Sequence, residues 1–167
     1  LLAEPCPADH PGLESIRFLL DRWHAERVDK PERLPPRDAF SPETLGRLLG
    51  RISLLEPIEG GRDFRYRIHA GIAADVGGLD LGGKRVGEMP YPDYREAIIR
   101  LFAGALEAEA PQLQRMRINW FGTIYDYIDV AMPLYDESRV TPVILSIMLH
   151  YDLERPTYVS RYRSASI

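Results

Sequence analysis

The chain has few of the residues that metal sites, disulfides and membrane spans require. Cys6 is its single cysteine, so no disulfide can form within the chain. None of the four histidines (His10, His24, His69 and His150) sits at a metal-ligand spacing such as C-x-x-C or H-x-x-x-H. No apolar run approaches the roughly 20 residues that cross a bilayer. We therefore expect no metal site and no membrane association, and the lone cysteine fits a cytoplasmic location.

Positive charge is also in short supply. The 21 Lys and Arg residues are outnumbered by 25 Asp and Glu residues, which gives a formal net charge of −4 and a pI near 5.6. A nucleic-acid-binding domain normally carries an excess of basic residues on one face, so the composition argues against a nucleic-acid partner. The chain has the length of one domain, and 45% of its residues are hydrophobic. We expect a soluble protein with a single core.

Segment 77–85, GGLDLGGKR, matches most of the phosphate-binding pattern G-x-x-x-x-G-K-[ST]. Arg85 stands where a Ser or Thr hydroxyl would hold magnesium, and Asp80 would place a carboxylate where the phosphate should lie. The preceding segment, AGIAADV, favours a helix, whereas a phosphate loop follows a strand. We therefore interpret the glycines as turn residues with a solvated Lys84, and we do not expect a bound nucleotide.

The hydrophobic pattern predicts an α+β order of elements. Apolar residues at three- and four-residue spacing predict helices, and period-two alternation predicts strands. A Gly-Gly turn joins the first two strands, which indicates an antiparallel hairpin. Helices are expected from residue 13 to before residue 31 and over 41–50, 70–78 and 92–109, and strands over 51–59, 63–70, 112–122, 123–136 and 141–152.

The same pattern divides the chain into three parts. Residues 1–40 hold the N-terminal helix and a proline-rich connector, PERLPPRDAF, in which each residue before a proline is pushed toward extended conformations. Residues 41–153 contain the remaining predicted helices and all the strands. Residues 154–167 form a polar C-terminal tail, which we expect to be loosely held.

Segment 64–89, FRYRIHAGIAADVGGLDLGGKRVGEM, resembles the core of a PAS domain, and it is most similar to the compact bacterial single-domain PAS family. Further similarity lies in W-x-x-x-R at 23–27, in segment 37–49 and in V-A-M-P-L at 130–134. Ala70 departs from the glycine of the family. The matching core positions are Tyr66, Arg67, Gly78, Asp80, Leu81, Gly83 and Lys84.

The resemblance implies a PAS-like five-stranded antiparallel sheet with helices on one face and an N-terminal helix. It also implies a stand-alone sensory or regulatory module in signal transduction, which binds a small molecule, a protein partner or both. The chain has no room for an output domain, so we expect a separate output protein. Haem is not expected because helix 92–109 carries no histidine. Flavin is not expected because no N-C-R-F-L type motif is present, and a linked chromophore would need a cysteine inside the domain.

Aromatic and apolar residues on the predicted sheet and its covering helix are the candidates for a ligand pocket. Core packing is the ordinary explanation for such residues, but Tyr and Trp bring polar tips that need partners when buried, as in a small-molecule site. The candidate ligand-binding residues are Phe64, Tyr66, Ile98, Phe102, Met116, Ile118, Trp120 and Tyr127.

The N-terminal helix carries its own apolar stripe, formed by Ile16, Leu19, Leu20 and Trp23. Such a stripe must be buried, either on the outer face of the sheet or in a dimer. An isologous interface is the common solution, so we expect a homodimer with these four residues at the interface.

No catalytic residue is expected. Asp126 and Asp129 lie three positions apart on one strand, which places them on opposite faces. Ser53 and Ser146 lack both a nucleophile motif and an adjacent base. Two alternatives to the sensory module stay open: a small cone-shaped α+β enzyme of the isomerase or dehydratase type, and a ligand-free adaptor. A His–Asp pair or two inward carboxylates in an internal cavity would favour the enzyme.

Overall fold

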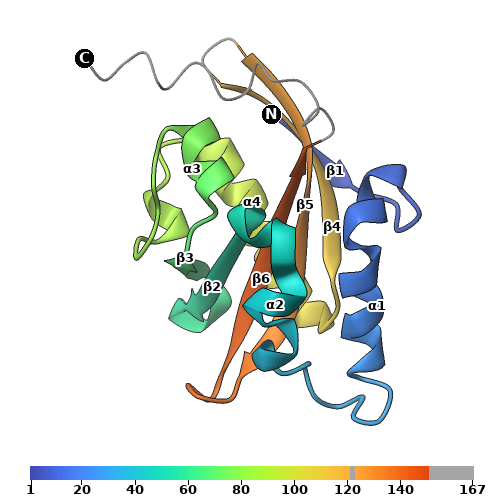
Figure 1. Cartoon of the computed structure of the whole chain (residues 1–167). Coiled ribbons are helices and arrows are strands. Elements are labelled where there is room, and N and C mark those ends of the chain that lie inside the picture. Colours follow the sequence, from blue (N-terminus) through green and yellow to red (C-terminus); the bar gives the residue numbers. More distant parts are fainter. Residues whose placement is uncertain (121–122, 151–167) are drawn as a thin grey trace.

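A computed structural model describes residues 1–120 and 123–150 of the chain. Its centre is one antiparallel sheet with the strand order β1-β4-β5-β6-β2-β3 (Figure 1). The α+β fold with five antiparallel strands is confirmed, and a sixth strand, β1, extends the sheet beyond β4. The strands are β1 (Leu2–Pro5), β2 (Ile52–Ile58), β3 (Asp63–Ile68), β4 (Gln112–Trp120), β5 (Thr123–Asp136) and β6 (Thr141–His150).

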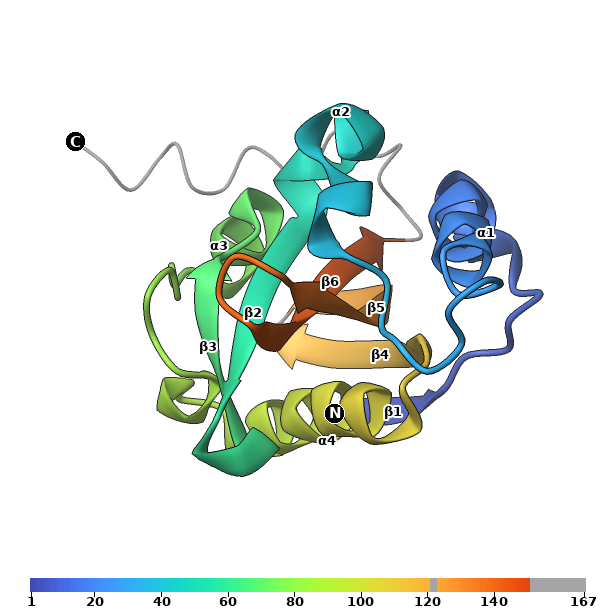
Figure 2. The same ribbon diagram turned by 90° about the horizontal axis from the view of Figure 1, so that it is seen from below.

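The helices cover both faces of this sheet. In Figure 2, α4 runs along one face, while α1 and α2 lie on the opposite side. In the described part of the chain, no helix is both long and apolar enough to cross a membrane. The helices are α1 (Arg17–Ala25), α2 (Pro42–Leu45), α3 (Gly71–Gly77) and α4 (Pro92–Ala108), with 3₁₀ turns at Pro11–Ile16, Arg37–Phe40, Gly46–Arg51, Glu59–Gly61 and Val86–Glu88.

Two apolar layers therefore enclose the sheet. The first core lies between the sheet and α3 and α4, and the second lies between the sheet and α1 and α2. Strand β6 shows the division, because Ile144 and Met148 enter the first core while Leu145 and Ile147 enter the second. Burial on both faces explains the nearly continuous apolar sequence of this strand.

The apolar stripe of the N-terminal helix is buried inside its own chain. Ile16, Leu19 and Trp23 belong to the second core with at most 3% of their surface exposed, and Leu20 packs against it. The indole Nε1 of Trp23 donates a hydrogen bond of 2.8 Å to the carbonyl oxygen of Pro133 on β5. The expected placement of this stripe at a dimer interface is thereby corrected, because its own sheet already covers it. A homodimer through another surface stays a prediction.

Strand β3 departs from strict alternation at its end. Leu55 pairs with Tyr66, but the neighbouring Leu54 pairs with Ile68, so Arg67 is an extra residue in a β-bulge. The bulge turns Ile68 away from the first core and leaves it 55% exposed, whereas strict alternation from Phe64 and Tyr66 would turn it inward.

Asp136 ties the proline-rich connector to the sheet. Its carboxylate, 1% exposed, accepts hydrogen bonds from Arg67 on β3 at 2.6 Å and from the Ser138 hydroxyl at 2.6 Å. Arg37 from the connector approaches the same carboxylate at 3.5 Å. Residues of the predicted N-terminal part thus pack on the same sheet as the rest of the chain, while the predicted tail, 154–167, lies outside the described residues.

Candidate functional site

The glycine-rich segment 77–85 folds against the outer edge of β3. The amide of Gly83 donates to the carbonyl of Tyr66 at 2.8 Å, and the amide of Tyr66 donates to the carbonyl of Lys84 at 2.9 Å. The carboxylate of Asp80 accepts from the amide two residues later at 2.9 Å. The amides of Gly82 and Gly83 are among those that a phosphate loop would present to an anion, and here they form hydrogen bonds within the chain itself.

A buried carboxylate holds the end of this segment to the hairpin. Asp63, 6% exposed, accepts hydrogen bonds from Arg85 Nε at 3.0 Å and from the amide of Gly87 at 3.1 Å. A Cβ atom at Gly87 would lie only 2.7 Å from the Asp63 carboxylate, so the close approach requires glycine. The motif residues therefore position a wall of the neighbouring cavity.

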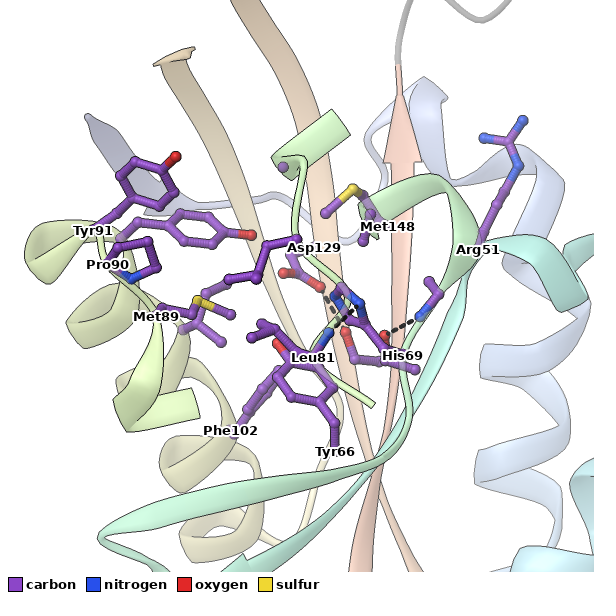
Figure 3. Close-up of a pocket in the computed structure, with 18 residues that line it drawn as sticks. Arg51, Tyr66, His69, Leu81, Met89, Pro90, Tyr91, Phe102, Asp129 and Met148 are labelled. Atoms are coloured by element: carbon purple, nitrogen blue, oxygen red, sulfur yellow. Dashed lines mark hydrogen bonds between the residues drawn. The ribbon is translucent and has the colours of Figure 1, made fainter. Parts of the chain in front are cut away.

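That cavity lies between α3, α4 and the sheet (Figure 3). Its volume of about 40 Å³ holds two or three water molecules. Aromatic and apolar side chains form most of the lining, and Tyr66, Phe102, Met89, Leu81 and Met148 are among them. A polar set completes it: Arg51, Ser53, His69, Asp129 and Ser146.

The candidate pocket residues divide into two groups. Tyr66, Ile98 and Phe102 line the cavity. Others belong to the first core around it without lining the cavity, and the side chain of Trp120 lies outside the described residues. The core residues that do not line the cavity are Phe64, Met116, Ile118 and Tyr127.

Asp129 is the buried carboxyl group of the site. Its side chain is 3% exposed and accepts a hydrogen bond of 3.0 Å from the hydroxyl of Ser146. Among the described residues, no Lys, Arg or His nitrogen lies within 4.0 Å of this carboxylate, and burial raises its pKa to about 7. The expectation that Ser146 has no base beside it was wrong, because Asp129 and Ser146 share the cavity face through the pairing of β5 with β6.

Asp126 and Asp129 point in opposite directions, as the alternation of β5 requires. Asp126 lies opposite Arg117 in the sheet register, and its carboxylate forms a 3.3 Å ion pair with that guanidinium on the exposed side. Alternation could have placed Asp129 on the inner face beside Tyr127. What alternation could not show is that a cavity lies there.

His69 is held by the glycine-rich segment. Its Nδ1 accepts a hydrogen bond of 3.2 Å from the amide of Leu81, and its ring meets Tyr66 edge-on at 4.8 Å. Burial lowers the pKa of His69, although Asp80 lies 3.5 Å from Nδ1. We assign the neutral ring with its proton on Nε2, because Nδ1 is already used as an acceptor.

Three tyrosines surround the carboxylate with neutral hydroxyls. Tyr127 donates a hydrogen bond of 3.0 Å to the hydroxyl of Tyr94, and burial raises the pKa of both groups and of Tyr66. The negative charge of Asp129 raises the pKa of each further. All three rings stay protonated at ordinary pH, so they contribute hydrogen bonds and ring surfaces.

The cavity holds one histidine and one aspartate, but they do not form a pair. No hydrogen bond or ion pair in the described part of the chain joins His69 to Asp129, since each uses other partners. Described His, Cys, Asp and Glu residues also form no group of three that could hold a metal ion. The site is thus a single carboxyl–hydroxyl pair in an aromatic enclosure, suited to binding a small polar group.

A sequence profile of the PAS domain family matches residues 12–132. The match covers well over half of the chain and includes the helices, the glycine-rich segment and most of the sheet. The chain therefore belongs to the PAS domain family. No curated protein and no solved structure matches it.

The buried position of Asp129 predicts an unusual pH dependence of stability. The folded chain keeps the Asp129 proton up to pH about 7, whereas the unfolded chain loses it near 3.8. Over that interval the native state binds more protons, so the free energy of unfolding falls as pH rises, by at most about 4 kcal/mol. Asp129→Asn removes this contribution while keeping an acceptor for Ser146.

Urea unfolding at pH 5, 6, 7 and 8 measures the effect. We expect Asp129→Asn to gain stability relative to the wild-type protein with each step up to pH 7, and the gain to level off above it. Asp126→Asn, on the exposed face of the same strand, serves as the matched control and should run parallel to wild type. Parallel curves for Asp129→Asn and wild type would show that Asp129 is already ionised in the native state.

Proposed function

We propose that the chain is a cytoplasmic sensory module that binds a small molecule in the cavity between α3, α4 and the sheet and passes the signal to a separate output protein. The PAS family supports a sensory or regulatory role in general. The observation that supports ligand binding is the Asp129–Ser146 pair inside an aromatic cavity. A carboxylate buried without a cation costs stability, so a purely structural core would be better served by an apolar residue.

A larger open hollow next to the cavity supplies a route for the ligand. It has a volume of about 410 Å³ and lies between the N-terminus, the start of α4 and β4. Tyr91 and Tyr94 line both spaces, so these two residues lie where the hollow adjoins the cavity. Movement of these rings would join the two volumes and admit a ligand larger than a few water molecules.

Binding accounts for the site better than catalysis does. Asp129 has Ser146 as its side-chain partner, and His69 is occupied by Leu81. An isomerase or dehydratase needs an acid and a base that converge on one substrate, and these two groups are directed to different partners. We infer that the module is not an enzyme.

The small volume of the cavity supports a second candidate, the ligand-free adaptor. A space of about 40 Å³ is far below what a metabolite fills, so a protein that never binds one could have the same core. In that case the chain would act through protein contacts alone.

Native mass spectrometry of freshly purified protein distinguishes the two candidates. We expect a non-covalent adduct that is lost on denaturation, because a co-purified ligand would survive gentle ionisation. Ala73→Leu adds bulk to the cavity wall and should remove the adduct. Ala103→Leu changes the same core without lining the cavity, so it should keep the adduct. A wild-type protein with no adduct, whose melting temperature no fragment-sized molecule shifts, would support the adaptor.

A further inference from the structure

The carboxylate of Asp129 has a hydroxyl partner but no counter-charge among the described residues. Ser146 donates to one of its oxygens, and no basic nitrogen comes within ion-pair distance. Arg51 also lines the cavity, but Figure 3 shows its guanidinium directed away from Asp129. An ionised Asp129 therefore places a negative charge at the wall of a small cavity that has room for only a few water molecules.

The other walls of the cavity also favour a positively charged ligand. Tyr66, Tyr94 and Phe102 present aromatic rings to the cavity, and Tyr91 closes it toward the neighbouring hollow. The faces of such rings carry negative electrostatic potential and attract cations, more strongly when water is excluded. A carboxylate and several rings around one small volume are complementary to a positive group, whereas an anion would be repelled.

We propose that the cavity recognises a small protonated amine, with its ammonium group beside Asp129 and Ser146 and its carbon chain toward Tyr91 and Tyr94. This inference rests on the proposed ligand-binding function. The ammonium donates hydrogen bonds to the carboxylate, and the Ser146 hydroxyl can turn to accept one. The hollow beyond Tyr91 and Tyr94 receives the carbon chain when the rings move.

Amine binding is coupled to the proton on Asp129. Only the ionised carboxylate pairs with the ammonium, so binding below pH about 7 releases a proton. The tyrosines remain neutral and His69 is uncharged, so none of them replaces Asp129 as the counter-charge. Besides Asp129, the titratable or charged groups that line this space are Tyr66 on β3, His69 just after β3, Tyr91 and Tyr94 at the start of α4, and Arg51 before β2. Tyr127 on β5 lies behind this lining, where its hydroxyl contacts that of Tyr94.

Three four-carbon probes that differ in charge test whether the cavity prefers a cation. We would titrate n-butylammonium, 1-butanol and butyrate into the wild-type protein and follow backbone amide shifts by NMR. At pH 8 we expect n-butylammonium to bind at least about tenfold more tightly than 1-butanol, which corresponds to one charge-assisted contact. At pH 6 its affinity should fall about tenfold, because most Asp129 is then protonated.

Two variants separate the role of the charge from that of the fold. Asp129→Asn should remove the preference for n-butylammonium and its pH dependence, while 1-butanol still binds. Asp126→Asn removes a carboxylate from the opposite face of β5 and should leave all three affinities unchanged. Amide spectra of each variant report whether it is folded, so a loss of binding by an unfolded protein is recognised.

The outcomes also separate this inference from the proposed function. If 1-butanol or butyrate binds as tightly as n-butylammonium, or if Asp129→Asn leaves amine binding intact, the cavity binds ligands of another kind and the inference is wrong. A co-purified adduct that proves to be neutral or anionic gives the same result. If no probe binds and no adduct is found, the small-molecule function fails together with the inference.

Discussion

Asp136→Ala is expected to lower the free energy of unfolding by about 3 to 5 kcal/mol. The carboxylate is 1% exposed, and its removal leaves the largely buried guanidinium of Arg67 without its partner. It also releases Ser138 in the β5–β6 turn and Arg37 in the connector. Because one group joins three segments, its loss should loosen all of them. Chemical unfolding followed by circular dichroism measures the change.

A matched control comes from the same strand. Asp126→Ala breaks an ion pair with Arg117 in which both side chains are substantially exposed, and such pairs contribute at most about 1 kcal/mol. Asp136 also has a pKa held well below its usual range, first by the hydrogen bond from Arg67 and then by Ser138. Its stabilisation is therefore present above pH about 4 and is lost as the pH falls below that value. Equal losses for the two alanine variants would contradict the anchoring role of Asp136.

Trp23→Ala should cost about 3 to 5 kcal/mol of unfolding free energy. The indole fills the second core beneath α1, and its loss leaves a cavity and removes the donor to the Pro133 carbonyl. Phe18→Ala, on the same helix, is the control, because Phe18 is 49% exposed and should cost little. Thermal unfolding of the three proteins measures the difference.

Protein concentration distinguishes burial within the chain from burial between chains. If Trp23 stabilises its own chain, the loss in Trp23→Ala is the same at low and high protein concentration. If α1 instead exchanged between two subunits, the melting temperature of wild type would rise with concentration and that of Trp23→Ala would not. The second result would restore the stripe of Ile16, Leu19, Leu20 and Trp23 to a dimer interface.

Much of the fold could be predicted because its elements carry strong periodicity. The β2–β3 hairpin, α4 and the three final strands all appear where the pattern places them. Strand β1 was missed because it has four residues and ends in Pro5, too short for alternation to be recognised. The partner of α1 was missed for a different reason. An apolar stripe shows that one face of a helix must be buried. It does not show what buries it, because either face of the sheet or a second subunit could do so.

The residues of the candidate site also fall into those that the sequence could identify and those that it could not. Tyr66 and Phe102 could be found because large aromatic residues on inward faces are candidates for any cavity. Alternation could place Asp129 on the inner face, but it could not show that Asp129 meets Ser146, because the two residues come together only through the pairing of β5 with β6. His69 is held at the cavity by the amide of Leu81, which lies twelve residues later in the chain. Contacts of this kind depend on three-dimensional closure of the chain, which no local pattern records.

The glycine-rich turn that resembles a phosphate loop also limits how other chains can pair with the edge of the sheet. By hydrogen-bonding to both sides of Tyr66, it occupies the middle of the outer edge of β3, which would otherwise offer unpaired backbone groups. Exposed sheet edges are templates on which foreign strands add and on which aggregates grow. A foreign strand could join this edge only after displacing the turn, which Asp63 and Arg85 clamp in place. The turn thus blocks the addition of a foreign strand at the edge of β3.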